Sequence, residues 1–257
     1  LNDMGLVTPT TIQERAFSVV MSGRDVIGIA QTGTGKTLAY LLPCLRQWTF
    51  TKDTAPQILI LVPTRELVVQ VVEQVKKLSA YMSVRVEGVY GGGNINTQSA
   101  QIEAGLDVLV ATPGRLIDFL LRGTLKTKSI KHLVIDEVDE MLTLGFRPQL
   151  TTILDLLPKK RQNLMFSATM SEEVESLISV FFNHPKKIEA APTGTPLENI
   201  EQTGYAVPNF NTKVNLLEML LADATVYSKV LVFVATKKLA DALYEKLALQ
   251  FPETIGV

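Results

Sequence analysis

The stretch Ala30-Gln-Thr-Gly-Thr-Gly-Lys36-Thr37 decides the fold of this 257-residue chain. It follows the apolar run Val26–Ala30, which is typical of a buried strand, and it opens the helical pattern Lys36–Gln47. A glycine-rich loop between a strand and a helix presents backbone N–H groups and the positive end of the helix dipole, which together suit a phosphate group. A plain glycine-rich turn is the alternative, but it does not account for the Lys-Thr pair at the start of the helix.

The same stretch predicts which groups would contact a nucleotide. Gly33 and Gly35 let the backbone approach phosphate oxygens closely. Lys36 is expected to neutralise the β- and γ-phosphates of ATP, and the Thr37 hydroxyl to bind Mg²⁺. The loop residues expected to contact the nucleotide are Thr32, Gly33, Thr34, Gly35, Lys36 and Thr37.

Short apolar runs alternate with helical patterns through the first 190 residues. The expected strands are Val26–Ala30, Gln57–Val62, Val84–Val89, Asp107–Ala111, His132–Asp136 and Asn163–Ser167. The expected helices are Lys36–Gln47, Arg65–Tyr81, Asn94–Ala104, Gly114–Leu121, Arg147–Leu156 and Glu172–Phe182. Nearly continuous apolar runs are typical of parallel strands covered on both faces. We therefore expect an α/β fold with a doubly wound, mostly parallel sheet that binds its ligands at the carboxyl ends of the strands.

A second, shorter pattern begins after a segment rich in proline, glycine and threonine. We expect a first domain over residues 1–190, a linker over residues 191–200, and the incomplete start of a second α/β domain over residues 201–257. The elements expected in this second domain are a strand Glu201–Val207, a helix Lys213–Ala222, a strand Lys229–Ala235 and a helix Lys237–Gln250.

Composition restricts where and how the protein works. A net charge of -1 does not favour a broadly basic surface, so any nucleic acid would be held by local groups and backbone amides. The single cysteine, Cys44, excludes an internal disulfide and fits a reducing compartment. No apolar run is long enough to cross a bilayer. We therefore expect a cytoplasmic protein without a membrane segment.

Three carboxylates follow the apolar run that begins at His132. A carboxylate at a strand end beside a phosphate-binding loop can hold Mg²⁺, so we assign Asp136 to the metal. Its neighbour Glu137 is expected to orient and deprotonate the attacking water. Because Asp139 and the residues after it also read as a helix start, an acidic N-terminal helix turn is the alternative.

Together the loop and these carboxylates resemble the DEAD-box RNA helicases, a family with a RecA-like core. The segment from Gly5 to Gln13 resembles the family's adenine-recognition motif, although Leu6 stands where phenylalanine is usual. An amide can pair with the adenine edge through two hydrogen bonds, so the resemblance implies that Gln13 recognises the base. Val138 replaces the alanine of the family's name and leaves the three carboxylates in place.

Three further stretches resemble the family's RNA-contacting motifs. They are Pro63-Thr64-Arg65, Gly91-Gly92 and Thr112-Pro113-Gly114-Arg115. Hydroxyls, glycine amides and arginine suit phosphate and sugar contacts, so the implied RNA binding is independent of base sequence. Each stretch alone is better explained as turn or helix-start chemistry, but three of them at successive strand ends favour RNA contact.

Ser167-Ala168-Thr169 resembles the motif that couples the nucleotide site to domain movement, partly through a hydroxyl contact to Asp139. A serine or threonine that caps the following helix is the alternative reading, and both can hold.

The resemblance implies an ATP-dependent RNA helicase, in which catalysis rests on Lys36, Asp136 and Glu137, and which separates short duplexes by domain closure. The sequence has no arginine after Arg161, and the family's arginine finger is expected beyond Val257. We therefore expect this chain to bind ATP and hydrolyse it weakly, and to self-associate through the incomplete second domain. Two alternatives stay open: a nucleotide- and RNA-binding module without catalysis, and another P-loop DNA translocase.

Overall fold

The computed structural model describes residues 2–190, 201–252 and 254–256. The chain divides into two compact units, one ending at Thr195 and the other beginning at Pro196. The linker predicted over residues 191–200 lies outside the described residues. No helix in the described ranges is long and apolar enough to span a membrane.

The first unit is built on a seven-stranded sheet in the order β3-β4-β2-β5-β6-β1-β7. Every pair of neighbouring strands is parallel, which confirms the α/β class and the parallel sheet expected from the sequence. The strands are β1 (Val26–Ile29), β2 (Ile58–Leu61), β3 (Val86–Val89), β4 (Val108–Ala111), β5 (His132–Ile135), β6 (Gln162–Ser167) and β7 (Lys186–Glu189).

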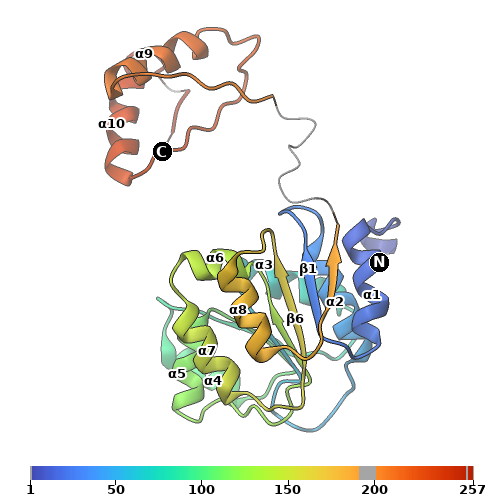
Figure 1. The fold of residues 1–257 in the computed structure, drawn as a ribbon. Coiled ribbons are helices and arrows are strands. Elements are labelled where there is room, and N and C mark those ends of the chain that lie inside the picture. Colours follow the sequence, from blue (N-terminus) through green and yellow to red (C-terminus); the bar gives the residue numbers. More distant parts are fainter. Residues whose placement is uncertain (1, 191–200, 253, 257) are drawn as a thin grey trace. The chain divides into compact units, whose positions relative to one another are not determined.

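Helices cover both faces of this sheet (Figure 1). Alternate residues of β2 belong to two separate apolar cores: Ile58 and Ile60 to one, Leu59 and Leu61 to the other. The first core is covered by α1 (Thr11–Met21), α2 (Lys36–Gln47) and α3 (Arg65–Leu78). The second is covered by α4 (Ile95–Glu103), α5 (Pro113–Leu121), α6 (Val138–Thr143), α7 (Arg147–Leu156) and α8 (Glu172–Phe181). Burial on both faces explains why β2 and β4 are apolar throughout.

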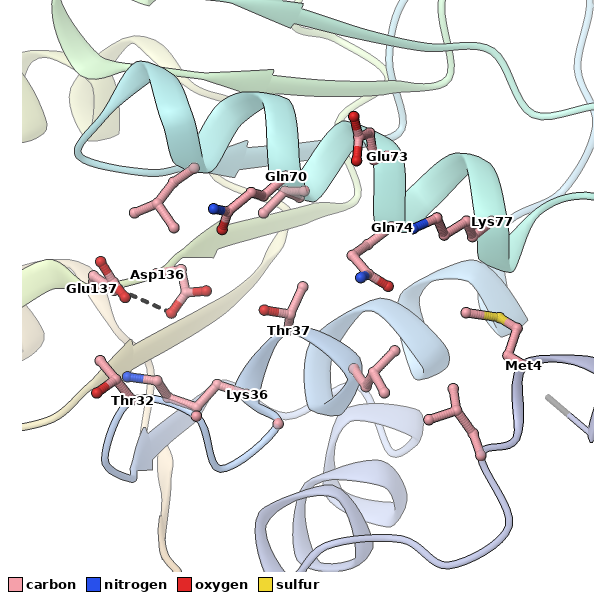
Figure 2. Close-up of a pocket in the computed structure, with 16 residues that line it drawn as sticks. Met4, Thr32, Lys36, Thr37, Gln70, Glu73, Gln74, Lys77, Asp136 and Glu137 are labelled. Atoms are coloured by element: carbon pink, nitrogen blue, oxygen red, sulfur yellow. Dashed lines mark hydrogen bonds between the residues drawn. The ribbon is translucent and has the colours of Figure 1, made fainter. Parts of the chain in front are cut away.

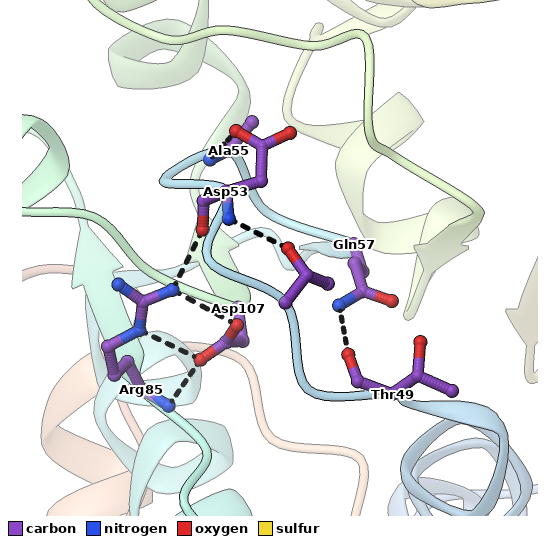
Figure 3. Close-up of polar contacts among 7 residues, drawn as sticks. Thr49, Asp53, Ala55, Gln57, Arg85 and Asp107 are labelled. Atoms are coloured by element: carbon purple, nitrogen blue, oxygen red, sulfur yellow. Dashed lines mark hydrogen bonds and ion pairs between the residues drawn. The ribbon is translucent and has the colours of Figure 1, made fainter.

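A polar network ties together the loops at the amino ends of β2, β3 and β4 (Figure 3). The Arg85 guanidinium donates to both oxygens of Asp107, at 3.0 and 3.2 Å, and to the carbonyl of Asp53 at 3.1 Å. Gln57 donates to the Thr49 carbonyl at 2.7 Å. These bonds hold the loops at the amino ends of the strands. The ligand site was predicted at the opposite, carboxyl ends.

Four elements of the first unit were not predicted: a short 3-10 helix η1 (Asn2–Met4), α1, α6 and β7. Helix α1 begins with a capping box in which Thr10 and Gln13 satisfy each other's backbone N–H groups. Helix α6 is a short helix that follows the carboxylates, as the alternative reading of that segment suggested. Strand β7 is an edge strand in which only Ile188 is buried, so its sequence lacks the apolar run of a central strand.

The prediction for the second unit is partly wrong. Its described part contains helices α9 (Phe210–Leu221) and α10 (Lys237–Leu247), close to the expected positions. The expected strands Glu201–Val207 and Lys229–Ala235 are not strands within the described residues. An apolar run forms a strand only where neighbouring strands satisfy its backbone, and here Phe233 stays 86% exposed.

Candidate functional site

A cavity of about 780 Å³ lies at the carboxyl ends of β1 and β5 (Figure 2). The phosphate-binding loop and the first turn of α2 form one wall, and the side chains of α3 face them from the other. The lining residues include Thr32, Gly33, Gly35, Lys36, Thr37, Gln70, Gln74, Asp136 and Glu137. The structure therefore brings the loop and the carboxylates predicted from separate motifs into one pocket.

The loop reaches α2 through two left-handed glycines. Gly33 has φ +79° and Gly35 has φ +89°, values that residues with a Cβ rarely adopt. The Thr34 hydroxyl donates to the Gln31 carbonyl at 2.7 Å, which closes the turn between them. This geometry leaves the first N–H groups of α2 pointing out of the helix end, where an anion can accept from them.

Gln13 connects the loop to the start of α1. Its side-chain amide donates to the Gly35 carbonyl at 3.1 Å, and its side-chain oxygen accepts from the Thr10 N–H at 3.0 Å. The left-handed φ favours glycine at position 35, and a Cβ there would also displace the Gln13 amide from its hydrogen bond. Each polar group of a glutamine can form a second hydrogen bond, so Gln13 still has capacity to bind a base.

Lys36 places a buried ammonium beside the two carboxylates at the end of β5. Its side chain is 6% exposed, and its ammonium forms no hydrogen bond with any described residue. Burial raises the pKa of the Asp136 and Glu137 carboxyls, and the nearby Lys36 charge offsets part of that rise. A buried charged donor without an acceptor is costly, so this ammonium fits a ligand that brings anionic oxygens into the pocket.

The two acidic residues at the end of β5 have different environments. Asp136 is buried, accepts the Glu137 N–H at 3.0 Å, and has a pKa raised by that burial. Glu137 adopts φ +53°, a strained conformation that turns the chain into α6. Burial, followed by the Asp136 charge, raises the pKa of Glu137 to about 7. A carboxyl with such a pKa can exchange a proton near neutral pH.

The donor set suits Mg²⁺. Thr37 and Asp136 offer oxygen ligands, and Mg²⁺ normally combines one or two protein oxygens with phosphate and water. Among the described residues no group of three or more His, Cys, Asp or Glu side chains could hold a metal alone. A Mg²⁺ held here would therefore depend on the phosphates of a nucleotide.

Asp139 joins α6 to the loop that follows β6. One of its oxygens accepts from the Ala168 N–H at 3.2 Å and from both the N–H and the hydroxyl of Thr169 at 3.0 Å. The Ser167 hydroxyl, by contrast, is fully buried and unbonded among the described residues. Of the two predicted coupling hydroxyls, only that of Thr169 contacts Asp139.

The three stretches predicted to contact RNA follow the neighbouring strands β2, β3 and β4. Thr64 caps α3 by accepting the Leu67 N–H at 3.3 Å, and Pro63 is buried beside it. The turn of Gly91 and Gly92 is open, with no atom within 4 Å of either position where a Cβ would stand. Thr112, Pro113 and Gly114 form the start of α5.

Side chains that the sequence did not single out hold these stretches together. The Gln98 oxygen accepts from Arg115 at 2.9 Å, and its amide donates to the Tyr90 carbonyl at 3.3 Å. Arg115 also donates to the Gly93 carbonyl at 3.1 Å, and the Arg65 guanidinium lies 4.8 Å from the centre of the Tyr90 ring. Gln98 is a polar residue that α4 buries together with Ile102. The sequence of the helix does not indicate that Gln98 is buried.

Comparison with known proteins agrees with this geometry. The family model described as DEAD/DEAH box helicase matches residues 10–177, from the start of α1 into α8. The chain belongs to the DEAD/DEAH box helicase family. The match includes the phosphate-binding loop, the carboxylates and all three RNA-related stretches.

Curated members of this helicase family align along nearly the whole chain. ATP-dependent RNA helicase DeaD of Buchnera aphidicola is 40% identical over 248 residues, which is 96% of this chain and 41% of that protein. DEAD-box ATP-dependent RNA helicase 30 of Arabidopsis thaliana is 40% identical over 249 residues, 95% of this chain and 42% of that protein. RNA helicase CrhR of Synechocystis is 40% identical over 247 residues, 96% of this chain and 50% of that protein. The chain thus spans half or less of each of these three relatives.

Proposed function

We propose that this chain is the nucleotide-binding part of an ATP-dependent RNA helicase. The buried and unpaired Lys36 ammonium beside two carboxylates is the observation that carries the proposal. The family membership supports it, because the aligned relatives are named as RNA helicases. Bound ATP with Mg²⁺ would supply the phosphoryl group that is hydrolysed.

Each residue of the pocket has a task in this proposal. The α2 amides and Lys36 bind the phosphates, and Thr37 and Asp136 hold the Mg²⁺. Glu137 orients the attacking water and takes its proton, for which a pKa of about 7 is suitable. Gln13 contributes hydrogen bonds to the adenine edge.

RNA would bind through its sugar-phosphate backbone along the carboxyl ends of β2, β3 and β4. The exposed Gly91-Gly92 turn, the amino ends of α3 and α5, and the two arginines offer amide and guanidinium donors to phosphates. None of these donors reads base edges, so binding and the separation of short duplexes would not depend on sequence. The bonds from Thr169 to Asp139 would transmit the state of the nucleotide to neighbouring domains.

The chain alone is proposed to bind ATP and to hydrolyse it weakly. Residues 1–190 act as the first helicase domain and 201–257 as part of the second, in a cytoplasmic protein. The sequence after Arg161 contains no arginine that could stabilise charge on the transferred phosphoryl group. In related phosphoryl-transfer enzymes such an arginine contributes roughly 10³–10⁵ in rate. The same observation supports the alternative of a nucleotide-binding module without catalysis.

The test is steady-state ATP hydrolysis with and without single-stranded RNA. It compares this chain with a version extended through a complete second helicase domain, each paired with a Lys36→Ala variant. We expect RNA to stimulate only the extended form and Lys36→Ala to abolish that response. Nucleotide binding without hydrolysis in either form would favour the binding module, and equal stimulation by DNA would favour a translocase.

A further inference from the structure

The hydroxyl of Tyr40 is a buried polar group that the proposed mechanism does not use. Tyr40 lies on α2, one helical turn after Lys36 and Thr37, and is 0% exposed. Its hydroxyl forms no hydrogen bond of ordinary geometry with any described residue. Buried hydroxyls in folded proteins almost always have a partner, so this one needs an explanation.

Among the described residues, Asp136 and Thr37 lie close enough to influence this hydroxyl, and Thr37 precedes Tyr40 by three residues on α2. Asp136 and Thr37 are both proposed Mg²⁺ ligands. Burial, and then the charge of Asp136, raises the pKa of Tyr40 well above its ordinary value. A phenol has an ordinary pKa of about 10, so it carries its proton at physiological pH and can act as a donor.

The surrounding packing fixes the position of the Tyr40 ring. Its centre lies 5.4 Å from that of Phe166, and the two rings are tilted by 52°. Phe166 stands directly opposite Gly28 in the register of β6 and β1. A Cβ at Gly28 would lie 2.5 Å from the Phe166 ring, so the bare glycine allows that ring to lie against β1. The packing of Tyr40 on Phe166, and of Phe166 on Gly28, therefore restricts the position of the Tyr40 hydroxyl.

A metal bound by Thr37 and Asp136 would order the hydrogen bonds among these groups. When the Thr37 oxygen gives a lone pair to Mg²⁺, its hydroxyl proton must point away from the metal and needs an acceptor. The Tyr40 oxygen can accept that proton, and the Tyr40 proton can in turn be donated to the Asp136 carboxylate. Asp136 already accepts the Glu137 N–H on one oxygen, so a second donor would fix its rotation.

We propose that Tyr40 is a positioning residue for the metal, which accepts a hydrogen bond from Thr37 and donates one to Asp136 when Mg²⁺ is bound. The inference rests on the proposed function, because it requires the pocket to bind a nucleotide with Mg²⁺. It assigns Tyr40 to the layer of residues that orient metal ligands without touching the metal.

The test is the Mg²⁺ dependence of nucleotide binding by Tyr40→Phe, which removes a single oxygen. A fluorescently labelled ATP is titrated into the protein, first in excess EDTA and then at increasing Mg²⁺ concentrations. Because residues that orient metal ligands typically contribute 10–100-fold to metal affinity, we expect the Mg²⁺ requirement to rise by roughly 10-fold. Binding in EDTA and the thermal unfolding midpoint should match those of the unmodified chain.

Tyr81→Phe is the matched control, since Tyr81 is 91% exposed and its hydroxyl donates to Asp3 at 3.1 Å. An unchanged Mg²⁺ requirement in Tyr40→Phe would overturn the inference. So would an equal loss of binding with and without Mg²⁺, because that would indicate a role in packing only. If the unmodified chain bound no ATP, the proposed function itself would fail, and Lys36→Ala serves as the reference for that outcome.

Discussion

His132 shows how a single buried side chain sets a pH limit on stability. It opens β5, and its Nδ1 lies 2.9 Å from the Gln162 side-chain oxygen. The Gln162 amide donates to the carbonyls of Val20 and Arg24, so its oxygen is the acceptor and His132 Nδ1 carries the proton. Burial is the largest cause that lowers the pKa of His132 below its ordinary value.

This lowered pKa predicts a loss of stability in acid. As pH falls through about 6.5, the unfolded chain takes up a proton at His132 before the folded chain does, so the free energy of unfolding decreases. We expect His132→Asn to lose less stability than the unmodified chain between about pH 7 and pH 5. Urea unfolding at each pH measures this difference.

His184→Asn is the control for that experiment. His184 is exposed at φ +43°, a conformation that asparagine tolerates. Its pH dependence should follow that of the unmodified chain. Identical pH dependence in His132→Asn and the unmodified chain would contradict the assignment.

At the scale of elements, Asp139 is the connection between α6 and the β6–α8 loop. Removing it in Asp139→Ala leaves two N–H groups and one hydroxyl without their acceptor. We expect the free energy of unfolding to fall by about 1–3 kcal/mol, and Thr169→Val to cost about 1 kcal/mol. Chemical denaturation of the two variants measures both values.

Asp155→Ala provides the comparison, because Asp155 is an exposed acid on α7 that makes no polar contact with any residue the structure describes. Its effect should stay within about 0.5 kcal/mol of zero. If Asp139→Ala were no more destabilising than Asp155→Ala, the bonds to Thr169 would not connect the two elements.

Elements were predictable where their burial produces a recognisable apolar pattern in the sequence. The central strands are covered on both faces, so each appears as an apolar run, and the class and parallel sheet follow. Strand β7 was not predicted, because it buries a single residue, Ile188, and so contains no apolar run. Lys229–Ala235 was wrongly predicted to be a strand. It is an apolar run, but no described strand pairs with it.

The pocket was predictable for a related reason. Lys36, Thr37 and Asp136 lie within short local motifs whose spacing is chemically specific. Tyr40 packs against Phe166 of β6 and Gln98 accepts a hydrogen bond from Arg115 of α5, and a single motif does not encode such contacts between elements. The spacing of Tyr40 from Thr37, three residues along one helix face, is the signal that would have singled it out.

At the scale of the whole molecule, exposed apolar side chains predict self-association through the second unit. Leu231 is 78% and Phe233 86% exposed, and both belong to an apolar run without a paired strand in the described structure. Such runs are templates for pairing with another chain. We expect light scattering to give a mass above 28.3 kDa that grows with concentration.

Replacing both residues, in Leu231→Lys with Phe233→Lys, should restore the monomer mass, because charged side chains oppose edge pairing. Tyr81→Lys alters an equally exposed side chain of the first unit and should leave association unchanged. A monomeric mass for the unmodified chain at all concentrations would contradict the prediction.

The hydrogen bond from Gln13 to the Gly35 carbonyl has a thermodynamic consequence. In the proposed site, one amide would both contact the base and support the loop that holds the phosphates. A ligand that moves this amide would also move the loop. Binding of the base and binding of the phosphates would therefore be energetically coupled. By reciprocity, phosphate occupancy would alter the affinity for the base to the same extent, so discrimination between nucleotides would differ between triphosphates and free nucleosides.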